Sequence, residues 1–588
     1  MAELADALAS GAKGRKPVRV QFSPSAQFMK KTTEDILKII PLGGCEEVGR
    51  NMTVFEYGKD IIVLDMGIQF PEEDMPGINY VIPNTKYLIG KEKNIKAIIF
   101  SHGHMDHIGA APLLINKLGN PQIIGRPFTL DMIKYRMEDY SPGSSKSLKT
   151  TYVKNIEENI DLGNFKIGFF PVDHAIVDAI GIIIYTPSAT VIHPGDWMIE
   201  HNPIGRKKIS YEQLARLPKP TVLMLESIGA TNSHKPVTEK EMLDNLKKLI
   251  QEAKGRTIIA TFSSQVERMK QIIEFASKFD KRVALDGFSM KISVEIARNL
   301  GYLKVRKETI IPMDQISNYP DKRIVVLCTG AQGEENAALP RIVNSDHRFI
   351  KIKKDDTVIF SSSVIPGNER TVQRLKDKLY RLCDNVIHSD IMDVHISGHS
   401  NIKDIEEIIR QIKPTFFIPV YANHFMLKEA AKIAYMMEIE KENIVVPDNG
   451  SVIEVSKNDI KVAKNKVPTD YVFVDGSRIG DIGEIVLNDR KKLAQDGMFV
   501  VVAVVDKKTG QVIGSPDIIS RGFIYLRESK ELLAETRKKT IYIINKTTGS
   551  GRAVNWVNLK EELKKKLSDF LFSKTERRPI ILPVVIEV

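Results

Sequence analysis

Short apolar runs alternate with turns and helical stretches from Ile36 onward. The runs at 61–64, 98–100, 181–185 and 190–192 are rich in isoleucine and valine, as β-strands are. Strands that alternate with helical stretches in this way are typical of an α/β layered domain. We therefore predict such a domain in the first part of the chain.

A second set of strand-like runs follows, and amphipathic stretches such as 239–253 separate its members. These runs lie at 221–225, 257–260, 282–285 and 323–327. The order strand, helix, strand predicts a mostly parallel sheet. Because ligand-type side chains return at His395 and His399, after the run at 357–360, we predict that this second unit is inserted into the first.

Composition along the chain divides it into five parts. We expect a flexible basic arm at 1–35, a split α/β domain at 36–208 and 370–455, an inserted α/β domain at 209–369, a lysine-rich linker at 456–470 and a small α/β domain at 471–588. In the last part we expect strands at 471–475, 484–488, 498–505 and 580–588. The basic arm is either a solvated tail or a segment that contacts RNA.

The composition is that of an ordinary folded enzyme, with 43% hydrophobic and 27% charged residues. Three scattered cysteines are too few for a disulfide framework, and no apolar run approaches the roughly 20 residues that cross a bilayer. We expect a cytoplasmic protein without a membrane segment. The formal net charge of +11 favours a polyanionic partner, because lysine and arginine release the counterions of phosphates on binding.

Metal-binding chemistry concentrates in the stretch Ser101-His102-Gly103-His104-Met105-Asp106-His107, directly after an apolar run. Imidazole nitrogens and carboxylate oxygens are ligands that borderline divalent ions accept. Alternate residues of an extended segment point the same way, so His102 and His104 can share one ion. Asp106 and His107, where we expect a helix to begin, would face a second ion, as in two-metal hydrolases. The alternative is that these histidines only cap or pack.

This stretch resembles the signature of the metallo-β-lactamase superfamily, whose other motifs follow at Asp65, His174 and Asp196. Phrases similar to the β-CASP insertion of nucleic-acid-processing members lie at 260–264, 328–334, 361–369 and 394–399. The phrases at 39–44, 519–523 and 577–583 resemble the bacterial ribonuclease J family. The resemblance covers about residues 36–588. It implies a metallo-β-lactamase αββα sandwich, an inserted β-CASP α/β domain and a small C-terminal α/β domain.

The resemblance also implies two divalent metal ions, with zinc expected first and manganese or magnesium as alternatives. One ion would be held by His102, His104, His174 and Asp196, and Asp196 would bridge to a second ion held by Asp106 and His107. Asp106 is also expected among the catalytic residues. Asp65 would orient a ligating histidine, although an aspartate of a strand-end turn is the alternative.

The segment His395-Ile396-Ser397-Gly398-His399 resembles the family's phosphate-gripping segment and precedes an expected helix. Amides at a helix N-terminus attract anions, and glycine permits close approach of the backbone. His399 is the candidate general acid for the leaving 3′ oxygen, and Glu226 is the acidic residue that would position it. Ser361, Ser362 and Ser363 would line the RNA path. Ordinary helix-cap and strand-to-helix turns are the alternatives for these segments.

Three places depart from the family's pattern. The phrase Pro419-Val420-Tyr421-Ala422-Asn423-His424 has Tyr421 where a histidine ligand is expected. A neutral phenol is a poor ligand at pH 7 because its pKa lies near 10, although a neighbouring cation lowers that value. We therefore expect weak binding of the second ion unless Tyr421 or His424 substitutes. Met105 and the phrase at 265–268 also differ from the family.

The resemblance implies a metal-dependent ribonuclease, a hydrolase with 5′–3′ exonuclease and endonuclease activity in RNA maturation and decay, including rRNA processing and mRNA decay. Its expected substrate is RNA with a 5′-monophosphate. The alternative is a weakly active or inactive paralogue that serves as a structural or RNA-binding subunit of a hetero-oligomer. A homodimer or homotetramer is the other expected assembly.

Overall fold

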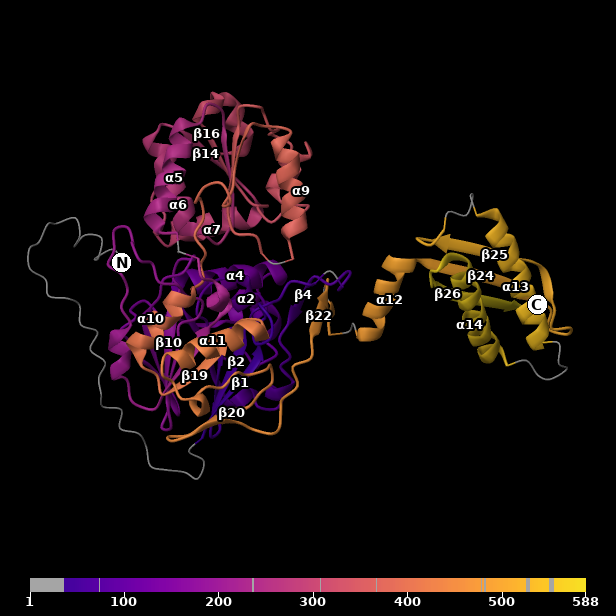
Figure 1. The fold of residues 1–588 in the computed structure, drawn as a ribbon, viewed down its shortest axis with the longest axis horizontal. Helices are drawn as coiled ribbons and strands as arrows, with labels where there is room; N and C mark the ends of the chain where they lie inside the picture. Colours follow the sequence, from indigo (N-terminus) through magenta and orange to yellow (C-terminus); the bar gives the residue numbers. More distant parts are fainter. Residues whose placement is uncertain are drawn as a thin grey trace, which may run out of the picture. The chain divides into compact units, whose positions relative to one another are not determined.

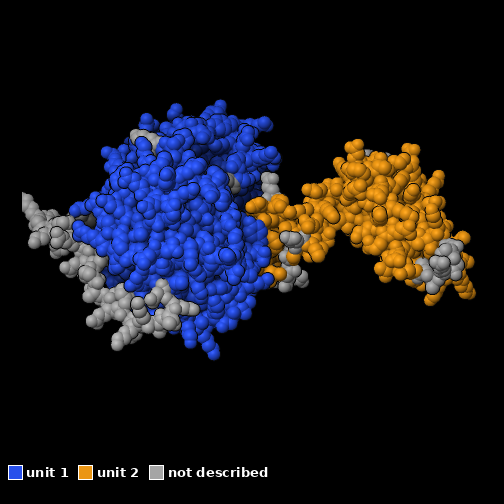
Figure 2. Space-filling view, turned by 60° about the horizontal axis from the view of Figure 1, so that its bottom comes forward, with its two compact units in different colours: residues 1–69, 82–471 blue, residues 70–81, 472–588 orange. Residues whose placement is uncertain are grey.

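The computed structural model describes residues 36–588 except 73, 235–236, 307, 366, 477, 481–482, 525–528 and 549–554. The expected basic arm at 1–35 lies outside the described residues. The chain divides into two compact units, residues 1–69 with 82–471 and residues 70–81 with 472–588 (Figure 2). Among the described helices, none combines the length and apolar composition that a bilayer crossing requires.

Two mixed sheets of the first unit pack against each other. The described strands of the first sheet, in spatial order, are β21 (Ile460–Val462), β20 (Ile453–Val455), β1 (Leu37–Gly43), β2 (Met52–Tyr57), β3 (Asp60–Leu64), β5 (Ile95–Ile99), β6 (Gln122–Gly125) and β7 (Lys149–Tyr152). Those of the second are β19 (Phe416–Val420), β12 (Thr221–Glu226), β11 (Thr190–His193), β10 (Ile180–Tyr185), β9 (Phe165–Pro171) and β8 (Ile160–Leu162). Side chains from both sheets, such as Phe55, Ile62, Ile182 and Val222, share one buried core.

Helices complete this sandwich on its outer faces. They are α2 (Met105–Ile108), α3 (Ala111–Leu114), α4 (Pro127–Tyr140), α10 (Ile402–Ile412) and α11 (His424–Met436). α4 contacts β6 and β7 of the first sheet. Ile405 and Ile408 of α10 and Ile433 of α11 pack with Leu223 and Phe417 of the second sheet. The expected αββα sandwich is therefore confirmed.

The inserted domain is built on a parallel sheet. Its described strands, in spatial order, are β15 (Ile310–Ile311), β14 (Arg282–Asp286), β16 (Ile324–Cys328), β13 (Thr257–Thr261), β17 (Thr357–Ser361) and β18 (Asn385–Ile387). One face packs against α5 (Glu239–Glu252), α6 (Val266–Lys278) and α7 (Phe288–Asn299). The other packs against α8 (Ala338–Val343) and α9 (Glu369–Tyr380). Figure 1 shows α5 and α6 on one side of this sheet and α9 on the other, as expected for parallel strands joined by helices.

Several strands have other partners than the sequence pattern indicated. β12, which we expected to open the inserted sheet, pairs with β11 and β19 of the sandwich. β18, expected in the split domain, pairs with β17 of the inserted sheet. β21, expected in the linker, pairs with β20. An apolar pattern identifies a strand without identifying its neighbour, which explains these differences. The other domain boundaries stay predictions.

The second unit contains two small sheets among its described residues. Its elements are β4 (Tyr80–Ile82), β22 (Val472–Asp475), β23 (Arg478–Ile479), α12 (Glu484–Asp496), β24 (Met498–Val505), β25 (Val512–Arg521), α13 (Lys530–Thr548), α14 (Trp556–Thr575) and β26 (Ile580–Glu587). The strand expected at 484–488 is the first part of α12. A short apolar run is ambiguous between helix and strand, and Ile485 is in fact 79% exposed.

The segment 70–81 belongs with the C-terminal residues, although some 400 positions separate them. Met75, Ile78 and Val81 form a small buried cluster with Phe473 and Leu487. The Asn79 amide donates a hydrogen bond to the Val474 carbonyl oxygen. The expected C-terminal domain is therefore completed by a segment that lies before the metal-binding stretch in the sequence.

Candidate metal centre

The candidate ligands lie in the turns and loops that follow strands of the sandwich. The stretch 101–107 follows β5, while Asp65, His174 and Asp196 follow β3, β9 and β11. His104 is the residue that precedes the first turn of α2 and has extended backbone. His104 therefore comes from extended chain and Asp106 and His107 from the helix, as the sequence predicts.

Three imidazole nitrogens converge on one point. Nδ1 of His104 lies 3.0 Å from Nε2 of His102 and 3.0 Å from Nε2 of His174. Oδ2 of Asp196 lies 3.8 and 3.9 Å from those two Nε2 atoms. Tetrahedral zinc with Zn–N bonds of about 2.0–2.1 Å would keep its nitrogen ligands about 3.3 Å apart. These four side chains therefore fit a single tetrahedral ion.

Neighbouring groups orient two of these rings, those of His174 and His102. Nδ1 of His174 donates to the Gly398 carbonyl oxygen over 2.6 Å, which leaves a lone pair on Nε2. The Ser101 hydroxyl donates to Asp65, so its oxygen accepts from Nδ1 of His102. Burial lowers the pKa of His174 to about 3, so this ring is neutral at pH 7. Metal-ligating histidines are typically held in this way.

A second set of ligand atoms adjoins the first. Nε2 of His107 lies 3.2 Å from Oδ1 of Asp196 and 3.5 Å from Oδ2 of Asp106. Burial alone would lower the pKa of His107, but the carboxylates of Asp196, Asp106 and Asp65 raise it well above its usual value. Oδ1 of Asp196 is buried and, beside its charge contact with His107, makes no hydrogen bond within the described residues. A divalent cation would satisfy this oxygen, so the donor set also fits a second ion, bridged by Asp196.

Asp65 lies behind this second set. Its Oδ2 is 2.8 Å from Nδ1 of His107, and its Oδ1 accepts a hydrogen bond from the backbone amide of Ser101. Because Nδ1 is engaged, Nε2 of His107 is the atom that faces the other ligands. The structure thus brings Asp65 to the position of an orienting residue.

His399 and Glu226 lie next to the ligand cluster. Nδ1 of His399 is 3.6 Å from Oε1 of Glu226 and 3.9 Å from Oδ2 of Asp196. Glu226 is fully buried at the end of β12. Burial would lower the pKa of His399, but Glu226, together with the carboxylates of Asp196 and Asp106, raises it to about 9, so the ring is cationic at neutral pH. A cationic imidazole in this place can donate a proton.

The loop that carries His399 is held against the inserted domain. Nη1 of Arg268 contacts Nδ1 of His395 at 2.7 Å and donates to the Ser361 carbonyl oxygen over 3.0 Å. The Ser361 hydroxyl donates to the carbonyl oxygen of Val394. Arg268 was predicted only as part of a divergent phrase, and no spacing signal tied it to His395.

The predicted substrate-binding residues differ in exposure. Ser361 and Ser362 are buried, whereas Ser363 and Ser397 are exposed. The Ser362 hydroxyl is 3.5 Å from the Gln332 amide nitrogen, which also donates to the Ser363 carbonyl oxygen. Ser361 and Ser362 therefore have partners within the protein. Among the three serines at 361–363, Ser363 is the one that solvent reaches.

Tyr421 and His424, the two possible substitute ligands, lie in different surroundings. Tyr421 is buried, and its ring centroid lies 5.4 Å from that of His107. Burial raises the pKa of its phenol well above the usual value, which keeps it neutral. His424 is the first residue of α11 and is exposed, with its Nδ1 3.9 Å from Asp448. His424 therefore does not reach back to the second set of ligands.

Two polar side chains near the cluster were missed by the sequence analysis. Asn51 places Nδ2 2.9 Å from Nε2 of His107 and 3.3 Å from Oδ2 of Asp106. His193 is buried and accepts a hydrogen bond from the Gly195 amide on Nδ1. Neither residue belongs to a cluster of ligand-type residues in the sequence. Asn51 comes near the cluster through the pairing of distant strands, whereas His193 is the last residue of β11, three positions before Asp196.

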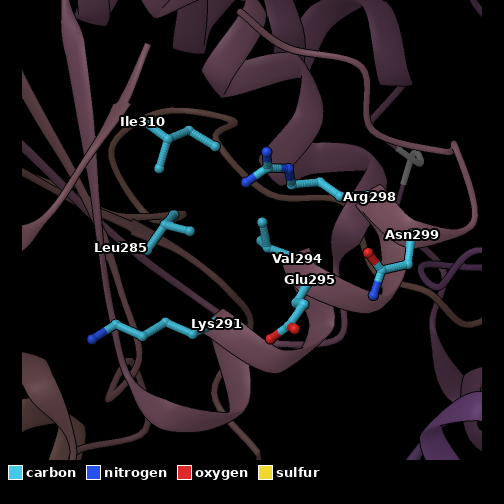
Figure 3. Close-up of a pocket in the computed structure, with 7 residues that line it drawn as sticks. All are labelled: Leu285, Lys291, Val294, Glu295, Arg298, Asn299 and Ile310. Atoms are coloured by element: carbon cyan, nitrogen blue, oxygen red, sulfur yellow. The ribbon is translucent and has the colours of Figure 1, made fainter. Parts of the chain in front are cut away.

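A hollow of the inserted domain, shown in Figure 3, lies between β14, β15 and α7. It is lined by Leu285, Lys291, Val294, Glu295, Arg298, Asn299 and Ile310. The set of lining residues includes none of the predicted site residues. We therefore base the functional argument on the metal centre.

Known protein families match the domains of this architecture. Sequence profiles match residues 46–209 (metallo-beta-lactamase superfamily), 254–379 (Ribonuclease J, beta-CASP domain) and 485–588 (Ribonuclease J C-terminal domain). Ribonuclease J 1 of Streptococcus pyogenes serotype M3 is 36% identical over 551 residues, which cover 93% of this chain and 97% of that protein. The chain belongs to the ribonuclease J family.

Other members of the ribonuclease J family align over similar lengths. Ribonuclease J2 of Bacillus subtilis strain 168 is 33% identical, with 95% of this chain and 100% of that protein covered. Ribonuclease J of Synechocystis is 34% identical, with 94% and 87% covered. A solved protein of unknown function from Enterococcus faecalis V583 shares the fold, with a TM-score of 0.51, 17% identity and coverage of 71% of this chain and 100% of that chain. The predicted family and architecture are confirmed.

Proposed function

We propose that this chain is a metal-dependent ribonuclease that acts in RNA processing. The observation that carries the proposal is the convergence of four histidines and two aspartates in a chain that matches ribonuclease J along most of its length. The metallo-β-lactamase superfamily implies divalent ions, and the donor sets above fit them. The sandwich alone would serve many hydrolases, whereas the β-CASP and C-terminal domains support an RNA substrate.

The proposed roles follow from the positions of the side chains. His102, His104, His174 and Asp196 would hold the first ion, with Asp106, His107 and Asp196 at the second. Bound divalent ions supply a hydroxide near neutral pH and positive charge for the phosphoryl oxygens. Asp65 keeps Nε2 of His107 directed at the site. Asp106 would take part in catalysis as a ligand of the second ion.

His399 is the proposed proton donor to the leaving 3′ oxygen. Its imidazolium is retained at neutral pH because the buried Glu226 carboxylate lies beside it. When the bond from phosphorus to the 3′ oxygen breaks, a proton from His399 would neutralise the departing oxygen. Glu226 would act through His399 as a positioning residue.

The proposal also covers the substrate, the compartment, the identity of the ion and the assembly. The substrate would be RNA with a 5′-monophosphate, cut by 5′–3′ exonuclease and endonuclease action in the cytoplasm. Exposed Ser363 and Ser397 are available to contact RNA, while His395 would act from its place beside Arg268. Zinc is the proposed ion of the three-histidine set. Assembly as a homodimer, a homotetramer or a hetero-oligomer with a paralogue is also proposed.

The test is degradation of 5′-monophosphorylated RNA by the purified protein and by His104→Ala and Tyr421→His variants, with metal content measured in each. We expect wild-type cleavage and a loss of about 100-fold or more in His104→Ala, because a ligand is removed from the first ion. Wild-type activity no greater than that of His104→Ala, but restored by Tyr421→His, would instead identify an inactive structural or RNA-binding subunit.

A further inference from the structure

The second set of ligand atoms is short of one partner. Asp106, His107 and Asp196 provide three ligand atoms, and the neighbouring Tyr421 is buried and carries a phenol in place of the expected imidazole. The Tyr421 ring packs edge-on against His107, with 80° between the ring planes. Four ligands are the usual number for a tightly held divalent ion. A fourth protein ligand from a neighbouring side chain would hold an ion at this site more tightly than these three alone.

Asn51 is the side chain that touches the ligand atoms directly. Its amide nitrogen lies 2.9 Å from Nε2 of His107 and 3.3 Å from Oδ2 of Asp106. The side chain is 1% exposed, so water does not compete for these contacts. Its backbone amide donates to the Asp106 carbonyl oxygen over 3.0 Å, and its carbonyl oxygen accepts from the Gly67 amide. The backbone of Asn51 is thus tied to the residues that form the site.

The other end of the Asn51 amide has no hydrogen bond. Oδ1 is buried and unpaired within the described residues. The oxygen and nitrogen of an amide occupy almost the same space, so a half-turn of the terminal group exchanges them. A cation between Asp106, His107 and Asp196 would repel the amide NH₂ and attract the oxygen. Turning the amide costs the contacts of Nδ2 with Asp106 and His107, which the cation would replace, but it breaks no hydrogen bond of Oδ1, because Oδ1 makes none.

We propose that Asn51 serves as a ligand of the second ion through Oδ1, in the role that Tyr421 does not fill. The proposal rests on the metal centre of the proposed function and deepens it. The second site would then have three oxygen-bearing ligands, Asp106, Asp196 and Asn51, and one nitrogen ligand, His107. The first site has three imidazoles and one carboxylate.

The two donor sets differ in the ions that they favour. Imidazole-rich tetrahedral sites suit zinc, whereas carboxylate and amide oxygens suit manganese and magnesium. A mixed centre follows, with zinc at the three-histidine site and manganese or magnesium at the Asn51 site. The second site would bind its ion more weakly, because it has fewer imidazoles and one neutral oxygen.

The test is Mn²⁺ binding to the full-length protein loaded with one equivalent of Zn²⁺. Electron paramagnetic resonance distinguishes free from bound Mn²⁺, and elemental analysis counts zinc. We expect one Mn²⁺ per chain in the wild type and binding at least 10-fold weaker in Asn51→Ala, with zinc content unchanged. Asn51→Asp should bind Mn²⁺ as tightly as the wild type or more tightly, because a carboxylate oxygen replaces the amide oxygen.

Asn84→Ala is the matched control, because Asn84 is also a buried asparagine but its side chain caps the backbone amide of Lys86. Its Mn²⁺ affinity should equal that of the wild type. Unchanged Mn²⁺ binding in Asn51→Ala, or a loss in Tyr421→Phe without a loss in Asn51→Ala, would overturn the proposal. RNA cleavage is assayed separately. An inactive protein with an Asn51-dependent Mn²⁺ site would contradict the ribonuclease function and leave this ligand assignment standing.

Discussion

At the scale of single residues, two buried carboxylates each engage one histidine. Asp65 contacts His107, and Glu226 contacts His399. Burial raises the pKa of each carboxyl group, while the positive charge of the partner histidine opposes that rise. Asp65 thereby orients the His107 ring through a contact of 2.8 Å, while Glu226 places a carboxylate 3.6 Å from His399 at the edge of the ligand cluster.

Glu226→Gln tests the proposed role of His399. Glu226, with Asp196 and Asp106, raises the His399 pKa to about 9, so the proton-donating form is present below that pH and is lost above it. Without the carboxylate, the pKa should fall by about one to three units, and the alkaline limb of the rate profile should move down equally. Cleavage rates measured from pH 5 to 10 check this.

Glu56→Gln serves as the control for that substitution, because Glu56 is a partly buried carboxylate that contacts Lys91 and Tyr87. Its alkaline limb should coincide with that of the wild type. An unchanged limb in Glu226→Gln would remove Glu226 from the proposed mechanism.

The sequence was sufficient to predict the place of some of these side chains in the site, but not of others. His102, His104, Asp106 and His107 could be assigned to two sets because the change from extended chain to helix lies within the motif. Asn51 could not, since its neighbours in space come from α2, more than 50 residues later. The direction of an exposed first-turn side chain, as at His424, also depends on packing that no spacing reveals.

At the scale of elements, the turn after β12 and the loop before α10 lie in close contact. A Cβ atom added to Gly229 would lie 1.6 Å from the carbonyl oxygen of Ser400, next to His399. Asn401 accepts hydrogen bonds from the amides of Lys403 and Asp404 and thereby fixes the start of α10. The separation of Glu226 and His399 therefore depends on a glycine at 229.

Gly229→Ala should push this loop away from β12. We expect the overpacking to lower the free energy of unfolding by about 1–3 kcal/mol. The cleavage rate should fall by a larger fraction than the folded population does. The melting temperature and the rate at pH 7 measure the two effects. Gly483→Ala is the control, because a Cβ atom there meets nothing within 4 Å. Full activity in Gly229→Ala would show that the loop is not held by this contact.

A sequence pattern determines some elements of this fold and leaves the partners of others open. The parallel inserted sheet could be predicted because helices separate strands rich in β-branched residues. The partners of β12 could not, since they include β19, almost 200 residues later. Register and neighbours depend on long-range packing, which periodicity does not encode.

At the scale of the whole molecule, the positive net charge favours binding of RNA. The formal net charge of +11 predicts binding that weakens with salt, because each contacted phosphate releases counterions. For about three to six contacts to single-stranded RNA, affinity should fall about 20- to 300-fold between 50 and 200 mM salt.

Fluorescence anisotropy with the cleavage-deficient His104→Ala protein measures this dependence. An RNA analogue with uncharged methylphosphonate linkages is the control, and its binding should vary little with salt. A slope near zero for natural RNA would contradict an electrostatic contribution.

The pairing of segment 70–81 with the C-terminal residues also delays the burial of this segment during synthesis. During synthesis, Met75, Ile78 and Val81 emerge from the ribosome long before their partners Phe473 and Leu487. At about 5–20 residues per second, the delay is on the order of 20–80 s. Throughout that interval the nascent chain presents an apolar segment that chaperones can bind, and a ribosome stalled before position 473 would leave it exposed.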